Sequence, residues 1–182
     1  MRPDPLRDGH PVSDKRKTRF TASYLRGFRL LPKGIFPTAR LHSTANESIL
    51  DNTVTIKAFN AVTWDRVSDE GATHADFRMA VTATDRLIIR IPGIYQVSIG
   101  ATWASDSTGY RKIGIKVNGN LSAAVLQDAV ATAVTMQGLT DPMELKSDDY
   151  LELEVLQTSG GALNVIGVVT FRPFLAAVWV GG

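Results

Sequence analysis

Cysteine is absent from the 182-residue sequence, which excludes disulfides, zinc–thiolate sites and a cysteine nucleophile. Folding therefore needs no oxidising compartment, and we expect the protein to assemble in a reducing cytoplasm. Long apolar runs are absent as well: no stretch could cross a bilayer, and residues 1–20 lack the apolar segment of a signal peptide. We therefore expect a soluble protein that is not exported by that route and has no membrane partner.

The sequence also lacks a recognisable set of catalytic or metal-binding residues. Its three histidines, His10, His42 and His74, stand far apart without metal-ligand spacing, and none accompanies a Gly-x-Ser-x-Gly nucleophile motif. We interpret them as surface or loop residues. A glycosidase pair of carboxylates is defined by its separation in space, which a sequence does not give. We predict a non-enzymatic protein without a cofactor or metal.

Acidic side chains gather near position 150, at Asp148, Asp149, Glu152 and Glu154. Oxygen ligands of this kind suit calcium. However, the two glutamates alternate with apolar residues, which predicts a strand whose glutamates face water. The apolar residues Leu151, Leu153 and Val155 are then expected to face inward. We interpret the acidic cluster as solvated and assign no calcium site to it.

Charge is distributed unevenly along the chain. Residues 1–34 hold nine Lys or Arg and three Asp, a net charge of +6, whereas the remainder holds 11 basic and 15 acidic residues, a net charge of −4. Three prolines and few large apolar residues before position 18 prevent this segment from folding alone. We predict an extended basic N-terminal arm over residues 1–34 and one domain over residues 35–182.

The arm combines positive charges with aromatic side chains, and we predict that both anchor it to a partner. The residues concerned are Lys15, Arg16, Lys17, Arg19, Phe20, Tyr24, Arg26 and Phe28. The spacing of the aromatics indicates a short amphipathic helix, although an irregular tether to the arm's own domain explains them equally well. A basic arm suits either nucleic acid or an acidic protein surface. We favour the protein surface because the body carries no nucleic-acid motif.

Residues 86–104, RLIIRIPGIYQVSIGATWA, give the clearest structural signal in the chain. After a Pro-Gly turn, apolar residues occupy every second position, at Tyr95, Val97, Ile99, Ala101 and Trp103. An alternation of this kind, rich in β-branched and aromatic side chains, is typical of a strand with one buried face. We expect this strand to lie at the centre of a sheet.

Further strands are predicted on both sides of it. The alternation of Ile113, Ile115 and Val117 runs into Asn118-Gly119, a residue pair favoured in two-residue hairpins, so residues 121–126 form the return strand. The other predicted strands cover residues 53–64, 129–137, 143–145, 151–155, 163–171 and 174–180, and residues 105–109 form a polar loop. Roughly eight to ten short strands without a long helix predict an all-β fold, a jelly-roll β-sandwich.

The body, about residues 50–180, resembles the globular-head domain of the first complement component and its tumour-necrosis-factor-like relatives. The likeness rests on Pro92-Gly93-Ile94-Tyr95-Gln96-Val97-Ser98-Ile99, on the polar turn and strand of residues 146–153, and on the closing pair Phe174-Leu175. The first stretch is similar to that family's Pro-Gly-x-Tyr-x-Phe-x-aromatic strand, with aliphatic residues in place of two aromatics. We take Pro92, Gly93, Tyr95, Val97, Ile99 and Phe174 as the motif and core residues of the body.

The resemblance implies a jelly roll that forms a homotrimer. Three segments, residues 129–136, 163–169 and 176–180, hold more small and apolar residues than one sandwich core needs, which favours the same conclusion. Secreted members of the family carry a signal peptide and often a collagen-like or coiled-coil stalk, which this sequence does not show. Phage structural proteins reuse the fold, are made in the bacterial cytoplasm and dock through N-terminal segments.

We therefore predict a phage virion structural protein, either a capsid decoration protein or a component of the tail or fibre. It would be assembled in the host cytoplasm, with capsid or tail proteins as its partners. The alternative is a receptor- or carbohydrate-binding module at a fibre tip, with a host receptor or glycan as partner. Trp64, Tyr95 and Trp103 are then candidates for a sugar pocket, although such aromatics more often belong to a core or subunit interface. A third class, a cytoplasmic nucleic-acid-binding protein, is not favoured, and we do not expect nucleic acid as a partner.

Overall fold

The structure of the protein is a computed structural model, and it describes residues 37–66, 79, 85–168, 170 and 172–182. These described residues form thirteen strands and no helix, which confirms the all-β prediction. The strands are β1 Thr38–His42, β2 Glu47–Ile49, β3 Thr55–Ile56, β4 Ala61–Arg66, β5 Arg86–Ile88, β6 Gly93–Trp103, β7 Asp106–Val117, β8 Asn120–Val130, β9 Val134–Leu139, β10 Met143–Leu145, β11 Tyr150–Gln157, β12 Leu163–Val165 and β13 Phe174–Gly181.

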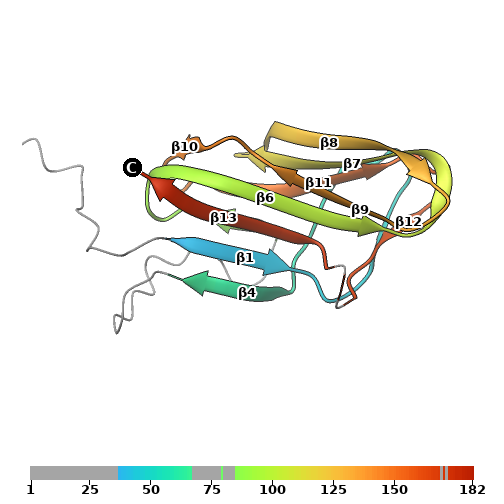
Figure 1. Cartoon of the computed structure of the whole chain (residues 1–182), viewed down its shortest axis with the longest axis horizontal. Helices are drawn as coiled ribbons and strands as arrows, with labels where there is room; N and C mark the ends of the chain where they lie inside the picture. The colour runs from blue at the N-terminus through green and yellow to red at the C-terminus, as the bar shows by residue number, and fades with distance from the viewer. Residues whose placement is uncertain (1–36, 67–78, 80–84, 169, 171) are drawn as a thin grey trace, which may run out of the picture. The chain divides into compact units, whose positions relative to one another are not determined.

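The strands are arranged in two antiparallel sheets. The large sheet contains the series β2-β12-β6-β13-β1-β4, in which neighbours pair. The strands β9 and β10 pair with β6 as well. The small sheet is ordered β3-β11-β7-β8, with β5 also paired to β11. In Figure 1, β4, β1, β13 and β6 form one layer, and β11, β7 and β8 belong to the other. The body is therefore a β-sandwich.

The strand β6 lies at the centre of the large sheet, as its sequence predicts. All five of its alternating apolar side chains, from Tyr95 to Trp103, are buried between the sheets. The hydroxyl of Tyr95 donates to the Ile91 carbonyl oxygen at 2.6 Å, so burial of this polar group is compensated. Apolar side chains of the small sheet, among them Ile113 and Leu153, pack against the same core. Contact between the two inner faces closes the sandwich.

The hairpin between β7 and β8 is also confirmed. Asn118 and Gly119 have φ angles of 52° and 78°, the positive values that a two-residue turn of type I′ requires at both central positions. The return strand continues past residue 126 to Val130. The register pairs Ile115 with Ala123, and β8 forms a long edge strand of the small sheet.

Three predicted strand boundaries are wrong. Residues 53–64 form two strands in different sheets, because the chain crosses between the sheets at Lys57, whose ammonium group is buried against Glu47. Residues 129–137 are interrupted, with β8 ending at Val130 and β9 beginning at Val134. The strand expected over residues 163–171 stops at Val165, where the chain turns away and the Gly167 amide donates to Asn46 Oδ1 at 2.8 Å.

The predicted polar loop over residues 105–109 is wrong as well, because β7 already begins at Asp106. The register between β7 and β8 shifts in this segment, and the guanidinium of Arg111, only 1% exposed, binds the displaced backbone. Its Nη1 donates to the carbonyl oxygens of Thr108 (2.9 Å) and Tyr110 (3.0 Å), and its Nη2 donates to that of Asp106 (3.0 Å). A buried side chain thus replaces the ladder hydrogen bonds that an irregular strand loses.

Candidate functional site

The residues predicted to anchor the arm lie outside the described part of the chain. This applies to Lys15, Arg16, Lys17, Arg19, Phe20, Tyr24, Arg26 and Phe28. His10 and His74 lie outside it too. The arm and its anchoring role therefore stay predictions.

The motif residues of the body lie along β6 and at the start of β13. Pro92 is exposed in the turn before β6, whereas Tyr95, Val97 and Ile99 are buried in the core. Gly93 lies beneath the end of β13, where an added Cβ would come within 2.8 Å of the Gly181 carbonyl oxygen. This close approach gives a steric reason for glycine at position 93. Phe174 is half-buried on the opposite face of the large sheet from the core.

That opposite, outer face of the large sheet carries an unusual group of apolar side chains. On a sheet face in contact with water, polar residues normally alternate with the buried ones. Here Val178 and Val180 of β13, Ile94 of β6 and Leu139 of β9 point outward and are 40–62% exposed. We call these four residues the apolar patch. Ile94, Val178 and Val180 lie near the end of the sheet where β6 begins and β13 ends, whereas Leu139 lies opposite Ser98 in the middle of β6. The strands β13 and β6 run side by side there (Figure 1).

The three apolar segments cited from the sequence contribute to this patch only in part. Met136, Leu163, Val165 and Ala177 are buried in the sandwich core, so they do not form surplus surface. The physical reason is that β9 and β12 belong to the same large sheet as β6 and turn their apolar residues inward. Val178 and Val180 are the exposed apolar residues of segment 176–180.

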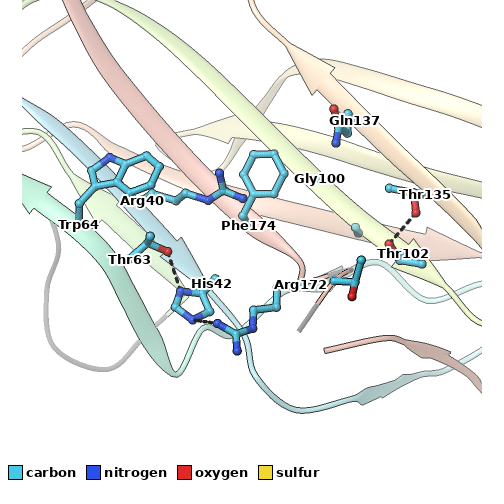
Figure 2. Close-up of a pocket in the computed structure, with 12 residues that line it drawn as sticks. Arg40, His42, Thr63, Trp64, Gly100, Thr102, Thr135, Gln137, Arg172 and Phe174 are labelled. Carbon is cyan, nitrogen blue, oxygen red and sulfur yellow. Dashed lines mark hydrogen bonds between the residues drawn. The ribbon is translucent and has the colours of Figure 1, made fainter. Parts of the chain in front are cut away.

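The other end of the same outer face contains a pocket of about 250 Å³. Its lining includes three basic side chains, two aromatic rings and a series of hydroxyl and amide groups, and comprises Arg40, His42, Thr63, Trp64, Gly100, Ala101, Thr102, Thr135, Gln137, Thr170, Arg172 and Phe174. Figure 2 shows the arginines and the aromatic rings on one side, with Thr102, Thr135 and Gln137 across from them. We call this the cationic pocket.

Arg40 is held between two aromatic rings. Its guanidinium carbon lies 4.0 Å from the ring centre of Phe174 and 5.4 Å from that of Trp64, within the range of cation–π attraction (Figure 2). The strand register explains why Arg40 lies between the two rings, since β1 pairs Arg40 with Trp64 on one side and lies beside β13 on the other. Gly100 leaves room for the Phe174 ring, because an added Cβ would come within 3.0 Å of its Cδ1. The stacking immobilises the guanidinium at the pocket wall.

Arg172 is the second cation of the pocket, and His42 holds it by a hydrogen bond. Arg172 Nη1 lies 3.2 Å from His42 Nε2, and Thr63 Oγ1 lies 2.9 Å from His42 Nδ1. An arginine can only donate, so Nε2 accepts and the neutral imidazole carries its proton on Nδ1, from which it donates to Thr63. Burial, followed by the charges of Arg172 and Arg40, lowers the pKa of His42 from its ordinary value of 6.5. His42 is therefore neutral at pH 7.

The position of His42 is a correction to the sequence interpretation. It was expected on the surface or in a loop, but it lies in β1, is 8% exposed and lines the cationic pocket. Its alternation with Arg40 along β1 is the sequence signal that could have placed both on one sheet face. Arg172 and Thr135 could not have been added, because their proximity depends on the pairing of distant strands.

The lowered pKa of His42 predicts a pH-dependent stability. The unfolded chain binds a proton near pH 6.5, whereas the folded chain takes it up only at a lower pH, so the unfolded state gains protons first as the pH falls. The stabilising contribution is complete above pH 6.5 and is lost as the pH falls towards the lowered pKa. We expect His42→Gln to show a smaller loss of stability between pH 7 and pH 5, measured by urea unfolding of both proteins. Equal losses would contradict this assignment.

The acidic cluster near position 150 is arranged differently from the prediction. Glu152 and Glu154 lie on the outer face of the small sheet but are only 5% and 4% exposed. They are covered by cations: Arg86 lies 3.1 Å from Glu152, and Lys112 lies 2.7 Å from Glu154. The prediction that they face water is therefore wrong, because cross-strand lysine and arginine side chains lie over them.

The two aspartates of the cluster occupy a turn and not the strand. Asp149 accepts hydrogen bonds from the Lys146 amide at 2.7 Å and from Asn118 Nδ2 at 2.8 Å, and these bonds lower the pKa of its carboxyl. Asp148 pairs with Arg90 at 3.1 Å. Within the part of the chain that the structure describes, no three His, Cys, Asp or Glu side chains come together in a way that could hold a metal ion.

The three aromatic residues considered for a sugar pocket separate into two groups. Tyr95 and Trp103 are buried in the core, as aromatics on alternating strands usually are. Trp64 instead lines the cationic pocket. The described residues include no helix with the length and apolar character needed to span a membrane.

Comparison with known proteins finds similarity in structure alone. No protein-family model and no curated protein matches the sequence. Among solved structures, murine APRIL at pH 8.5 matches with a TM-score of 0.58 and 13% identity over 80% of this chain and 99% of its own. The Eiger TNF of S. frugiperda matches with a TM-score of 0.56 and 12% identity over 81% and 94%. The PRD1 vertex protein P5 matches with a TM-score of 0.53 and 14% identity over 81% and 99%. The body thus has a tumour-necrosis-factor-like jelly-roll fold, as the sequence predicted.

Proposed function

We propose that this tumour-necrosis-factor-like jelly roll is a non-enzymatic structural protein of a phage particle, in which the body trimerises and the N-terminal arm attaches the trimer to the capsid or tail. The observation that carries the proposal is the similarity to PRD1 vertex protein P5, which extends over 99% of that chain. The identity is only 14%, so this similarity concerns the fold, and the features of this chain described next add support for the role on a particle.

The apolar patch supports association of the bodies. Its four side chains lie on three neighbouring strands of one sheet, and exposed apolar groups gathered in this way commonly mark a protein interface. Burial stabilises such an interface by about 25 cal/mol per Å² of apolar surface. A threefold axis beside the large sheet would remove the patch from water in all three subunits.

The charge asymmetry supports an anchoring role for the arm. A net charge of +6 within residues 1–34 contrasts with the acidic remainder of the chain. Lysine and arginine would guide the arm towards an acidic surface, and Phe20, Tyr24 and Phe28 would bury apolar area once it is bound.

Deletion of residues 1–34 tests the arm directly. We expect the shortened protein to fold and trimerise as the full chain does, because the described strands begin at Thr38. Incorporation into particles, measured by quantifying the protein in purified virions, should fall to background. A variant with Lys15, Arg16, Lys17 and Arg19 changed to Gln should also be incorporated poorly, because it lacks the positive charges that would bind the acidic surface. Normal incorporation of the truncated protein would refute the anchoring model.

A further inference from the structure

The cationic pocket contains positive charge that no acidic side chain of the described residues neutralises. None of the carboxylates in the described ranges forms an ion pair with Arg40 or Arg172. By contrast, Arg86, Lys112 and Arg111 each lie against an acidic side chain. A pair of guanidinium groups in one pocket without a counter-ion is a binding arrangement for an anion.

The hydrogen bonding of Arg172 points the same way. Within the described residues, Arg172 donates from Nη1 to the neutral imidazole of His42, and its buried Nε has no acceptor. A buried N–H without an acceptor carries a desolvation cost that a bound ligand oxygen would remove. Because His42 is neutral, it orients Arg172 without neutralising it. The side chain therefore keeps its charge available at the pocket wall.

Two features of the pocket distinguish a sugar acid from a simple inorganic anion. Beyond the arginines lie hydroxyl and amide groups, with Thr102 Oγ1 bonded to Thr135 Oγ1 at 2.9 Å and Gln137 beside them (Figure 2). Such groups donate to and accept from sugar hydroxyls. The volume of about 250 Å³ lies below the ~300–1,000 Å³ typical of pockets for drug-sized ligands, which suits a single sugar ring. The ring of Trp64 adds an apolar wall.

We propose that the cationic pocket binds a sugar carboxylate, such as a uronic acid unit of an acidic glycan. Arg172 and Arg40 bind the carboxylate, and Thr102, Thr135 and Gln137 contact the hydroxyl groups of the ring. The proposal does not rest on the role in a virus particle. The pocket is distinct from most of the apolar patch, since Ile94 and Gly100 are separated by roughly 20 Å at about 3.3 Å per strand residue. Only Leu139 approaches the pocket, two residues from Gln137 along β9.

Titration of the full-length protein with glucuronate, followed by NMR or calorimetry, tests the assignment. Glucose is the matched neutral ligand, because it differs from glucuronate only at the carboxylate carbon. We expect saturable binding of glucuronate and none of glucose at the same concentrations. Arg172→Gln should weaken glucuronate binding by at least about tenfold, the effect of losing one charge-assisted hydrogen bond.

Two further variants test whether glucuronate binding depends on this pocket, and not on the total charge or on a loss of folding. Arg90→Gln removes an exposed arginine that pairs with Asp148 away from the pocket, and it should leave glucuronate binding unchanged. Gln137→Ala alters an exposed side chain, so the fold should persist, and it should weaken glucuronate binding less than Arg172→Gln does. Unchanged melting temperatures would confirm that these variants fold.

Three results would overturn the proposal. The first is equal binding of glucuronate by the wild type and a folded Arg172→Gln variant. The second is binding of acetate or sulfate as tight as that of glucuronate, which would show that the sugar ring is not recognised. The third is tighter binding of a glutamate-containing peptide, which would identify a protein side chain as the occupant. None of these measurements depends on particle assembly, so the proposed function and this inference can fail separately.

Discussion

Val178→Asp is expected to reduce the oligomer in solution from three chains to one while the fold persists. Val178 lies in the middle of β13 with its side chain on the outer face of the large sheet, 42% exposed. In the trimer, the aspartate would lose water and face other apolar side chains without a cation. An unpaired charge buried in this way costs several kcal/mol at each copy, which opposes association.

Light scattering on a sizing column at micromolar concentration measures this effect, and circular dichroism confirms the strand content. The matched control is Leu126→Asp, because Leu126 is an equally apolar, 61% exposed strand residue on the outer face of the small sheet. That variant should stay trimeric. A wild-type protein that is monomeric under these conditions would remove the intrinsic trimer from the model. Dissociation by both variants would show that the interface is not confined to the apolar patch.

The second large effect is expected at Arg111, where methionine should lower the free energy of unfolding by about 3–5 kcal/mol. The side chain is almost fully buried and binds three carbonyl oxygens of residues 106–110. Methionine fills much of the same volume but donates no hydrogen bond. The three carbonyls would then depend on water reaching the start of β7, and each one left unpaired costs about 1–3 kcal/mol.

Urea unfolding of the two proteins measures the difference. Arg90→Met is the control, because Arg90 is exposed and pairs with the exposed Asp148, so its loss should cost no more than about 1 kcal/mol. Arg111→Lys should lie between the two, since an ammonium group keeps the charge but cannot reach all three carbonyls in the same geometry. A loss below about 1 kcal/mol for Arg111→Met would show that the segment does not depend on this side chain.

The sequence predicted the parts of the fold that local periodicity determines. Every second residue of β6 is apolar, and burial follows that alternation from Tyr95 to Trp103. The positive φ angles of Asn118 and Gly119 are equally local, since they depend on the residue types at the turn. The prediction of one strand over residues 53–64 was wrong because alternation identifies an extended chain but not the sheet that it joins.

The prediction that the glutamates of β11 face water was wrong for a related reason. Their position on the outer face of the small sheet follows from alternation with Leu151 and Leu153. Their burial does not, because it results from side chains of β5 and β7 that cross over them. Alternation thus gives the face of a residue, whereas exposure also depends on how long the neighbouring side chains are.

The cationic pocket lay almost wholly beyond sequence reasoning. Arg40 and His42 share a strand and a face, so their proximity was accessible. Arg172 and Gln137 come from other segments, and they reach the pocket only because β13 pairs with β1 and β9 pairs with β6. Registers between strands far apart in sequence are set by the packing of the whole sandwich. The sequence therefore offers Trp64 as a candidate for a sugar pocket but does not place the arginines beside it.

The order of strands in the large sheet also bears on when the protein can fold during synthesis. The strand β13 lies between β1 and β6, so neither of these earlier strands finds that partner until residues 174–181 have left the ribosome. Pairings between distant segments carry a high cost of loop closure and form slowly. Until then, the edges of β1 and β6 present unpaired backbone groups, which are targets for aggregation and for chaperones. Slow translation of the earlier segments would therefore do little to help folding, because the large sheet is complete only after β13 has emerged.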